Sequence, residues 1–131
     1  ARVALGPDLP ALFGHDEALV ADLLSAGTAV GDPMWRLPLW PGYRDMLKST
    51  IADINNAGEG GFAGAITAAL FLDRFVEPGV AWAHFDLFAW SPAARPGRPR
   101  GGAAMTLRAV WQVVTSRFAA AQNNRTPHET S

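Results

Sequence analysis

The chain has 131 residues, of which 49% are hydrophobic and 18% are charged, and its formal net charge at pH 7 is −1. This length suits one modest domain or a part of one, and the apolar content indicates a buried core rather than a disordered segment. The nearly neutral charge argues against a nucleic-acid partner, and the absence of cysteine excludes a disulfide framework and a thiolate metal site.

The first third of the chain predicts one helix. Residues Val3–Leu5 are expected to form the tail of a strand, after which a loop reaches Asp16. From Asp16 to Ala29 the apolar residues fall mainly on one helical face, and the acidic start suits a helix N-terminus. The residues on that face are Leu19, Val20, Leu23, Leu24 and Ala26.

An extended segment and a short helix are expected next. Residues Met34–Trp40 alternate between large apolar and other side chains, which indicates a strand. Pro38 and Pro41 restrict that segment to the edge of a sheet, because proline cannot donate a ladder hydrogen bond. Residues 43–48 suit a short helix.

The middle of the chain suggests a strand, a tight loop and a buried helix. Residues 51–54 are short and apolar, residues 57–61 are rich in glycine, and residues 64–75 mix small and large apolar side chains. This order is typical of a βαβ unit with a parallel sheet, and we expect the helix to be buried nearly all round. The apolar run 62–72 is shorter than the ~20 residues that cross a bilayer, so no membrane partner is expected.

The last third predicts a strand, a loop and a helix. Residues 80–89 form the strongest strand pattern, residues 91–102 are a loop rich in proline, glycine and arginine, and residues 103–121 have amphipathic spacing. A polar tail, residues 122–131, is expected to be disordered. The predicted fold is therefore α/β, with a partial, mainly parallel sheet and flanking helices over residues 1–121.

Four segments together resemble one enzyme family. They are GDPMWRLPLW at 31–40, KSTIADINNAGEGGFAGAITAALFLDRF at 48–75, WAHFDLFAW at 82–90 and ARPGRPRGG at 94–102. Their order is similar to the C-terminal part of the catalytic domain of the cytosolic leucyl aminopeptidases. The metal-binding signature of that family, Asn-Thr-Asp-Ala-Glu-Gly-Arg, lies upstream of these segments and is absent from this chain.

The resemblance implies a parent enzyme that releases N-terminal amino acids from peptides. Its family uses two divalent metal ions, Mn or Zn, and forms cytoplasmic homo-oligomers, typically hexamers. No metal ligand or catalytic residue of the family has a matching position here, so we expect no metal bound by this chain and no activity from it alone. The alternative is a non-enzymatic assembly or interaction module that uses a tryptophan-rich surface, with Trp35, Trp40, Trp82 and Trp90 beside the predicted strands.

Two residues are candidates for the wall of the pocket that receives the first side chain of the substrate. The family strand often reads His-x-Asp-Ile-Ala-Gly, and Phe88 stands here in the place of the alanine that lines the pocket. Gly64, at the start of the predicted helix, is a second candidate because ligands collect at the carboxyl ends of parallel strands. An aromatic ring at Phe88 would narrow the pocket and favour side chains smaller than leucine.

His84 and Asp86 stand two residues apart on a predicted strand, so both side chains point to one face. The pair suits a metal site or an orienting pair, and it equally suits a buried histidine bonded to a carboxylate. A metal ion would need further ligands, and Asp53 is the one acidic residue on the other predicted strand. The matching pair is not a metal ligand in the family that the chain resembles, which favours the structural interpretation.

Two loops suggest anion binding. Residues 55–61 lack both Gly-x-Gly-x-x-Gly and Gly-Lys-Ser/Thr, so a tight turn explains their glycines better than a nucleotide site does. Arg95, Arg98 and Arg100 could hold a carboxylate or a phosphate by bidentate contacts. A solvated or subunit-contact loop is the simpler interpretation, because three arginines on a neutral domain are a weak signal.

Overall fold

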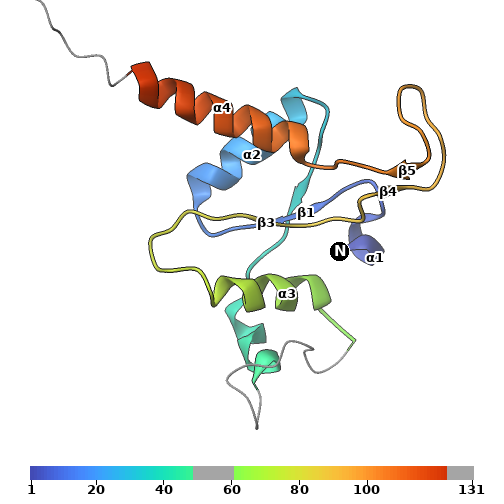
Figure 1. Cartoon of the computed structure of the whole chain (residues 1–131). Coiled ribbons are helices and arrows are strands. Elements are labelled where there is room, and N and C mark those ends of the chain that lie inside the picture. The colour runs from blue at the N-terminus through green and yellow to red at the C-terminus, as the bar shows by residue number, and fades with distance from the viewer. Residues whose placement is uncertain (49–60, 124–131) are drawn as a thin grey trace, which may run out of the picture.

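A three-stranded sheet lies at the centre of the computed structural model, which describes residues 1–48 and 61–123 (Figure 1). The strands are β1 (Ala11–Phe13), β2 (Trp35–Arg36) and β3 (His84–Asp86), in the order β2-β1-β3. Strand β1 runs parallel to β2 and antiparallel to β3. The predicted α/β class is confirmed, and the described sheet is mixed.

Helices cover both faces of this sheet. The helical elements are α1 (Arg2–Leu5), α2 (Glu17–Ala29), the 3-10 helix η1 (Pro41–Leu47), α3 (Gly64–Asp73) and α4 (Leu107–Asn123). Helices α2 and α4 lie on one side, and α3 and η1 lie on the other (Figure 1). A separate hairpin joins β4 (Trp90–Ser91) to β5 (Gly101–Gly102).

Strand β1 connects the two sides of the fold. Its three residues have no exposed surface. Leu12 packs with residues of α2 and α4, whereas Ala11 and Phe13 pack with Ala69 of α3. Alternate side chains of a strand point to opposite faces, so a central strand with both faces covered must be apolar at every position.

The N-terminal predictions were wrong in two places. Residues Val3–Leu5 belong to helix α1 rather than to a strand, and the stretch predicted as a loop up to Asp16 contains β1. A strand of only three residues shows no alternating pattern, because both of its faces are buried. The signal for β1 was therefore too short to distinguish from an apolar loop.

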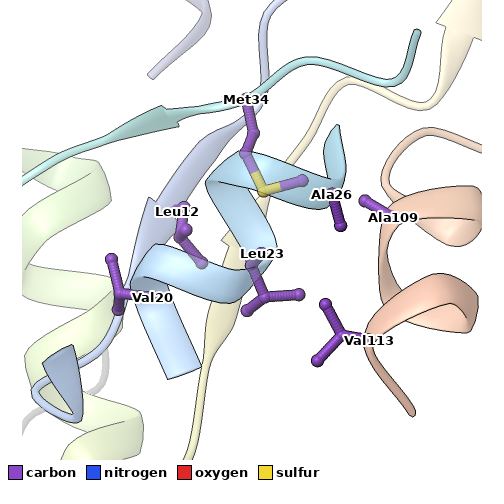
Figure 2. Close-up of a cluster of buried hydrophobic side chains, with 7 residues drawn as sticks. All are labelled: Leu12, Val20, Leu23, Ala26, Met34, Ala109 and Val113. Carbon is purple, nitrogen blue, oxygen red and sulfur yellow. The ribbon is translucent and has the colours of Figure 1, made fainter. Parts of the chain in front are cut away.

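Helix α2 confirms the helix predicted over 16–29. Asp16 caps its N-terminus by accepting a hydrogen bond from the Leu19 N–H at 2.6 Å. Figure 2 shows the main core cluster, in which the apolar face of α2 meets β1 and α4. Its buried members are Leu12, Val20, Leu23, Ala26, Met34, Ala109 and Val113.

Gly27 allows the chain to fold back closely over the end of α2. A Cβ atom there would lie 2.7 Å from the Asp32 carbonyl oxygen and 3.1 Å from the Met34 methyl carbon. The Asp32 N–H also donates to the Gly27 carbonyl oxygen at 2.8 Å. Gly31, at φ 64°, supplies the left-handed residue that turns the chain here.

Asp32 joins this turn to the N-terminus of α4. Its side chain is 8% exposed. One carboxylate oxygen accepts the Thr106 N–H at 3.0 Å, and the other accepts the N–H groups of Arg108 at 3.0 Å and Ala109 at 3.4 Å. Thr106 itself has φ 64°, an unfavourable conformation for a β-branched residue, and the bond to Asp32 helps to hold it. A carboxylate here also complements the helix dipole.

The later elements differ from prediction in extent. The strand expected over 80–89 is limited to His84–Asp86, and the loop expected over 91–102 contains the β4–β5 hairpin. Helix α3 occurs as predicted but is not buried all round, since Leu72 is 41% exposed. The predicted strand 51–54 and all but Gly61 of the loop 55–61 lie outside the described residues, as does the tail beyond Asn123.

We expect Asp32→Ala to lower the free energy of unfolding by about 2–3 kcal/mol, because it leaves several N–H groups at the start of α4 without their acceptor. Urea denaturation would measure the loss. Asp22→Ala is the matched control, since Asp22 forms only an exposed ion pair with Arg117 and should cost less than about 1 kcal/mol. Equal losses in the two variants would contradict the capping role.

Candidate functional site

Phe88 lies just beyond β3, beside helix α1. Its side chain is 37% exposed, and the Arg2 guanidinium carbon lies 4.9 Å from the centre of its ring. Asp86, Leu87 and Phe88 line a hollow of about 200 Å³ together with residues of the α1 region. The ring is therefore placed where it could narrow an adjacent pocket.

Gly64 begins α3 and does not line this hollow. The residue before it, Ala63, has φ 56° and is the N-cap of the helix. Among the described residues, no atom lies within 4 Å of the place that a Cβ atom at Gly64 would take. The two predicted pocket residues therefore lie at separate places in the described structure.

His84 and Asp86 both lie on β3, opposite Phe13 and Ala11 of β1. The imidazole stacks on the buried Phe13 ring, with centroids 5.8 Å apart. Burial lowers the pKa of His84, and the negative charge of Asp86 opposes that shift. These contacts make His84 a part of the sheet packing, but it is only partly buried, and among the described residues Asp86 pairs with the Ala1 amino group rather than with the imidazole.

The residues present do not fit a metal centre. Within residues 1–48 and 61–123 no three histidine, aspartate or glutamate side chains come close enough together to hold a metal ion. His84 and Asp86 lack a third partner among them. Asp53 lies outside the described residues.

Two arginines of the basic loop reach a larger hollow that the sequence did not reveal. Arg95 and Arg98 line it, whereas Arg100 does not. Arg108, Asp8 and Trp90 line it too. These residues come from distant positions in the chain, so no local motif could have predicted that they meet.

A family comparison decides where the chain belongs. The sequence model of the cytosol aminopeptidase family, catalytic domain, matches residues 1–111. The chain is a member of this family. The resemblance found from the sequence is thereby confirmed.

The relatives are much longer than the chain. A probable cytosol aminopeptidase of Geobacter sulfurreducens is 46% identical over 108 residues, which are 81% of this chain and 21% of that protein. The crystal structure of the cytosol aminopeptidase from Coxiella burnetii is 51% identical, with a TM-score of 0.84, and the match covers 89% of this chain and 26% of that one. The bottromycin maturation enzyme BotP in complex with Mn is 34% identical, with a TM-score of 0.82 over 88% of this chain and 26% of that one.

None of the helices in the described part of the chain has both the length and the hydropathy that a membrane span requires.

We expect stability to fall as the pH is lowered through the region below 6.5, because the folded state disfavours the protonated imidazole of His84. The contribution is complete above the ordinary pKa of 6.5 and is lost as the pH falls toward the lowered pKa. The slope should not exceed about 1.4 kcal/mol per pH unit.

Urea denaturation at intervals between pH 7.5 and 5.5 would measure this dependence. His84→Gln should flatten the profile, because glutamine does not titrate in this range. An unchanged profile in His84→Gln would show that another group is responsible.

Proposed function

We propose that this chain is the C-terminal part of the catalytic domain of a metal-dependent aminopeptidase that releases N-terminal amino acids from peptides. The observation that carries the proposal is the match of the family's catalytic domain to residues 1–111. The structural similarity to the Coxiella burnetii enzyme over 89% of the chain supports it. The chain spans about a fifth to a quarter of these relatives, so the activity is proposed for the whole protein.

The metal ions of the parent enzyme would bind outside the described residues. The family is metal-dependent, and the similar BotP structure is a complex with Mn, which supports a divalent metal ion. By analogy with the family we propose two such ions, Mn or Zn. Such ions supply a hydroxide nucleophile near neutral pH and stabilise charge on the attacked carbonyl. The described residues contain no cluster to hold them, so we propose that this chain alone is inactive.

Phe88 and Gly64 are proposed to shape the substrate pocket from the side of this segment. The partly exposed ring of Phe88 borders a hollow, whereas Gly64 lies apart from it at the start of α3. A bulky wall residue favours small substrate side chains, because a pocket rejects what it cannot accommodate. We therefore propose a preference for side chains smaller than leucine.

An assembly role is the second candidate, and the exposed tryptophans favour it. Trp35, Trp40 and Trp111 are 58–69% exposed. Exposed aromatic residues are enriched at protein interfaces. A cytoplasmic homo-oligomer, a hexamer by analogy with the family, would bury such residues and is compatible with the enzymatic role.

Hydrolysis of leucine and alanine p-nitroanilides, with added Mn²⁺ or Zn²⁺, tests the proposed activity. We expect no turnover by this chain and clear turnover by a chain extended upstream to include the family's metal signature. The control is the extended chain with the acidic residues of that signature changed to alanine. Turnover by the short chain that disappears in His84→Asn would contradict the proposal.

Phe88→Ala in the extended chain tests the pocket. Removing the ring should raise kcat/KM for leucine p-nitroanilide about tenfold relative to alanine p-nitroanilide, since extra methylene groups in an apolar pocket are each worth up to about 1–3 kcal/mol. Phe75→Ala is a control, because Phe75 is an exposed aromatic residue outside the hollow. If the ratio of the two kcat/KM values is unchanged in Phe88→Ala, Phe88 does not line the substrate pocket. The proposed aminopeptidase activity would not be affected by that result.

A further inference from the structure

The larger hollow lies between the β4–β5 hairpin and the start of α4. Its volume is about 410 Å³, within the range of small-molecule sites. The Gly31–Pro33 turn and the Ala103–Leu107 segment also line it. We call this hollow the arginine cleft, after Arg95, Arg98 and Arg108.

The charged groups of the arginine cleft favour an anion. Three guanidinium groups face two carboxylates, Asp8 and Asp32, so positive charge is in excess. Asp8 already accepts a hydrogen bond from Arg95 at 2.9 Å, and Asp32 is committed to the N–H groups of α4. Among the described residues, Arg98 has no ion-pair partner.

A tight turn presents Arg95 and Arg98 together. The two residues exchange backbone hydrogen bonds of 2.8 Å in both directions, with Pro96 and Gly97 between them. Gly97 has φ 70°, so the turn has proline at its second position and a left-handed glycine at its third. Two like charges directly opposite each other are unfavourable unless an anion lies between or beside them. Asp8 forms an ion pair with Arg95, whereas the guanidinium of Arg98 can bind a ligand anion.

The remaining walls of the cleft are apolar. Trp90, which is 46% exposed, lies across the hairpin from Gly102, and Pro10, Met105 and Leu107 also line the space. A ligand that fits must therefore combine an anionic end with an apolar body. A guanidinium fork matches a planar carboxylate by two parallel hydrogen bonds.

We propose that the arginine cleft binds a small carboxylate with an apolar side group, as found at the C-terminal residue of a short peptide. Arg98 binds the carboxylate, and Trp90 packs against the apolar group. This site is separate from Phe88 and Gly64, and the proposal does not depend on the proposed function.

Isothermal titration of this chain with N-acetyl-L-phenylalanine tests the proposal. The neutral N-acetyl-L-phenylalaninamide is the matched ligand, and sodium sulfate tests for any small anion. We expect the carboxylate to bind at least fivefold tighter than the amide, with affinity that falls as salt is added. Sulfate should compete only weakly, because it has no apolar group to pack on Trp90.

Two variants locate the binding. Arg98→Gln should weaken carboxylate binding roughly fivefold to tenfold, since a charge-assisted hydrogen bond is lost. Arg100→Gln is its control, because Arg100 lies in the same loop but outside the cleft. Gly102→Leu should fill the cleft, since a Cβ atom there would meet no atom of the described residues within 4 Å and would share a face with Trp90. Gly61→Leu is the control for that change, because its Cβ atom would likewise meet none of the described atoms and it lies outside the cleft.

Circular dichroism would confirm that each variant keeps its helix content. Equal binding of acid and amide, or equal competition by sulfate, would overturn it by showing no selective site. Binding that survives Gly102→Leu, or that weakens equally in Arg98→Gln and Arg100→Gln, would place the ligand elsewhere and also overturn it.

Discussion

The hydrogen bonds of Asp32 are the constraint on which the rest of the structure depends. This carboxylate is nearly buried, and it binds three backbone N–H groups that lie 74 to 77 residues further along the chain. Arg108 strengthens the same junction by donating to the Gly31 carbonyl oxygen at 2.8 Å. The end of α2 and the start of α4 are thereby fixed relative to each other. Their apolar faces can then form one core with β1.

The arginine cleft is formed in part by the same junction between the Asp32 turn and α4. The turn that carries Asp32 forms one wall, and the first residues of α4 form another. The carboxylate that caps the helix keeps its charge and lies 4.0 Å from an Arg108 guanidinium nitrogen, while Asp8 pairs with Arg95, so the excess positive charge of the cleft is that of Arg98. The turn at Gly31–Pro33 therefore serves both the hydrogen bonds to α4 and the wall of the cleft.

The sequence predicted the helices α2, α3 and α4 well, because each has an apolar pattern at helical spacing over at least ten residues. It predicted less of the sheet, since β1 and β3 have only three residues each and owe their strand geometry to pairing with each other. It gave no sign that the side chain of Asp32 reaches α4. Phe88 came from family resemblance and Gly64 from its place at a predicted strand-to-helix junction, while the arginine cleft depends on contacts between distant residues that no local pattern encodes.

The position of β1 has a consequence for how this chain folds. Its partner β2 begins more than twenty residues later in the chain, and β3 begins more than seventy residues later. Loops of this length must close before the pairing provides any stabilisation, so these pairings are expected to form slowly. During synthesis on the ribosome, β1 cannot pair with β3 until residues beyond Asp86 emerge. In that interval its three apolar residues are a natural binding segment for a chaperone.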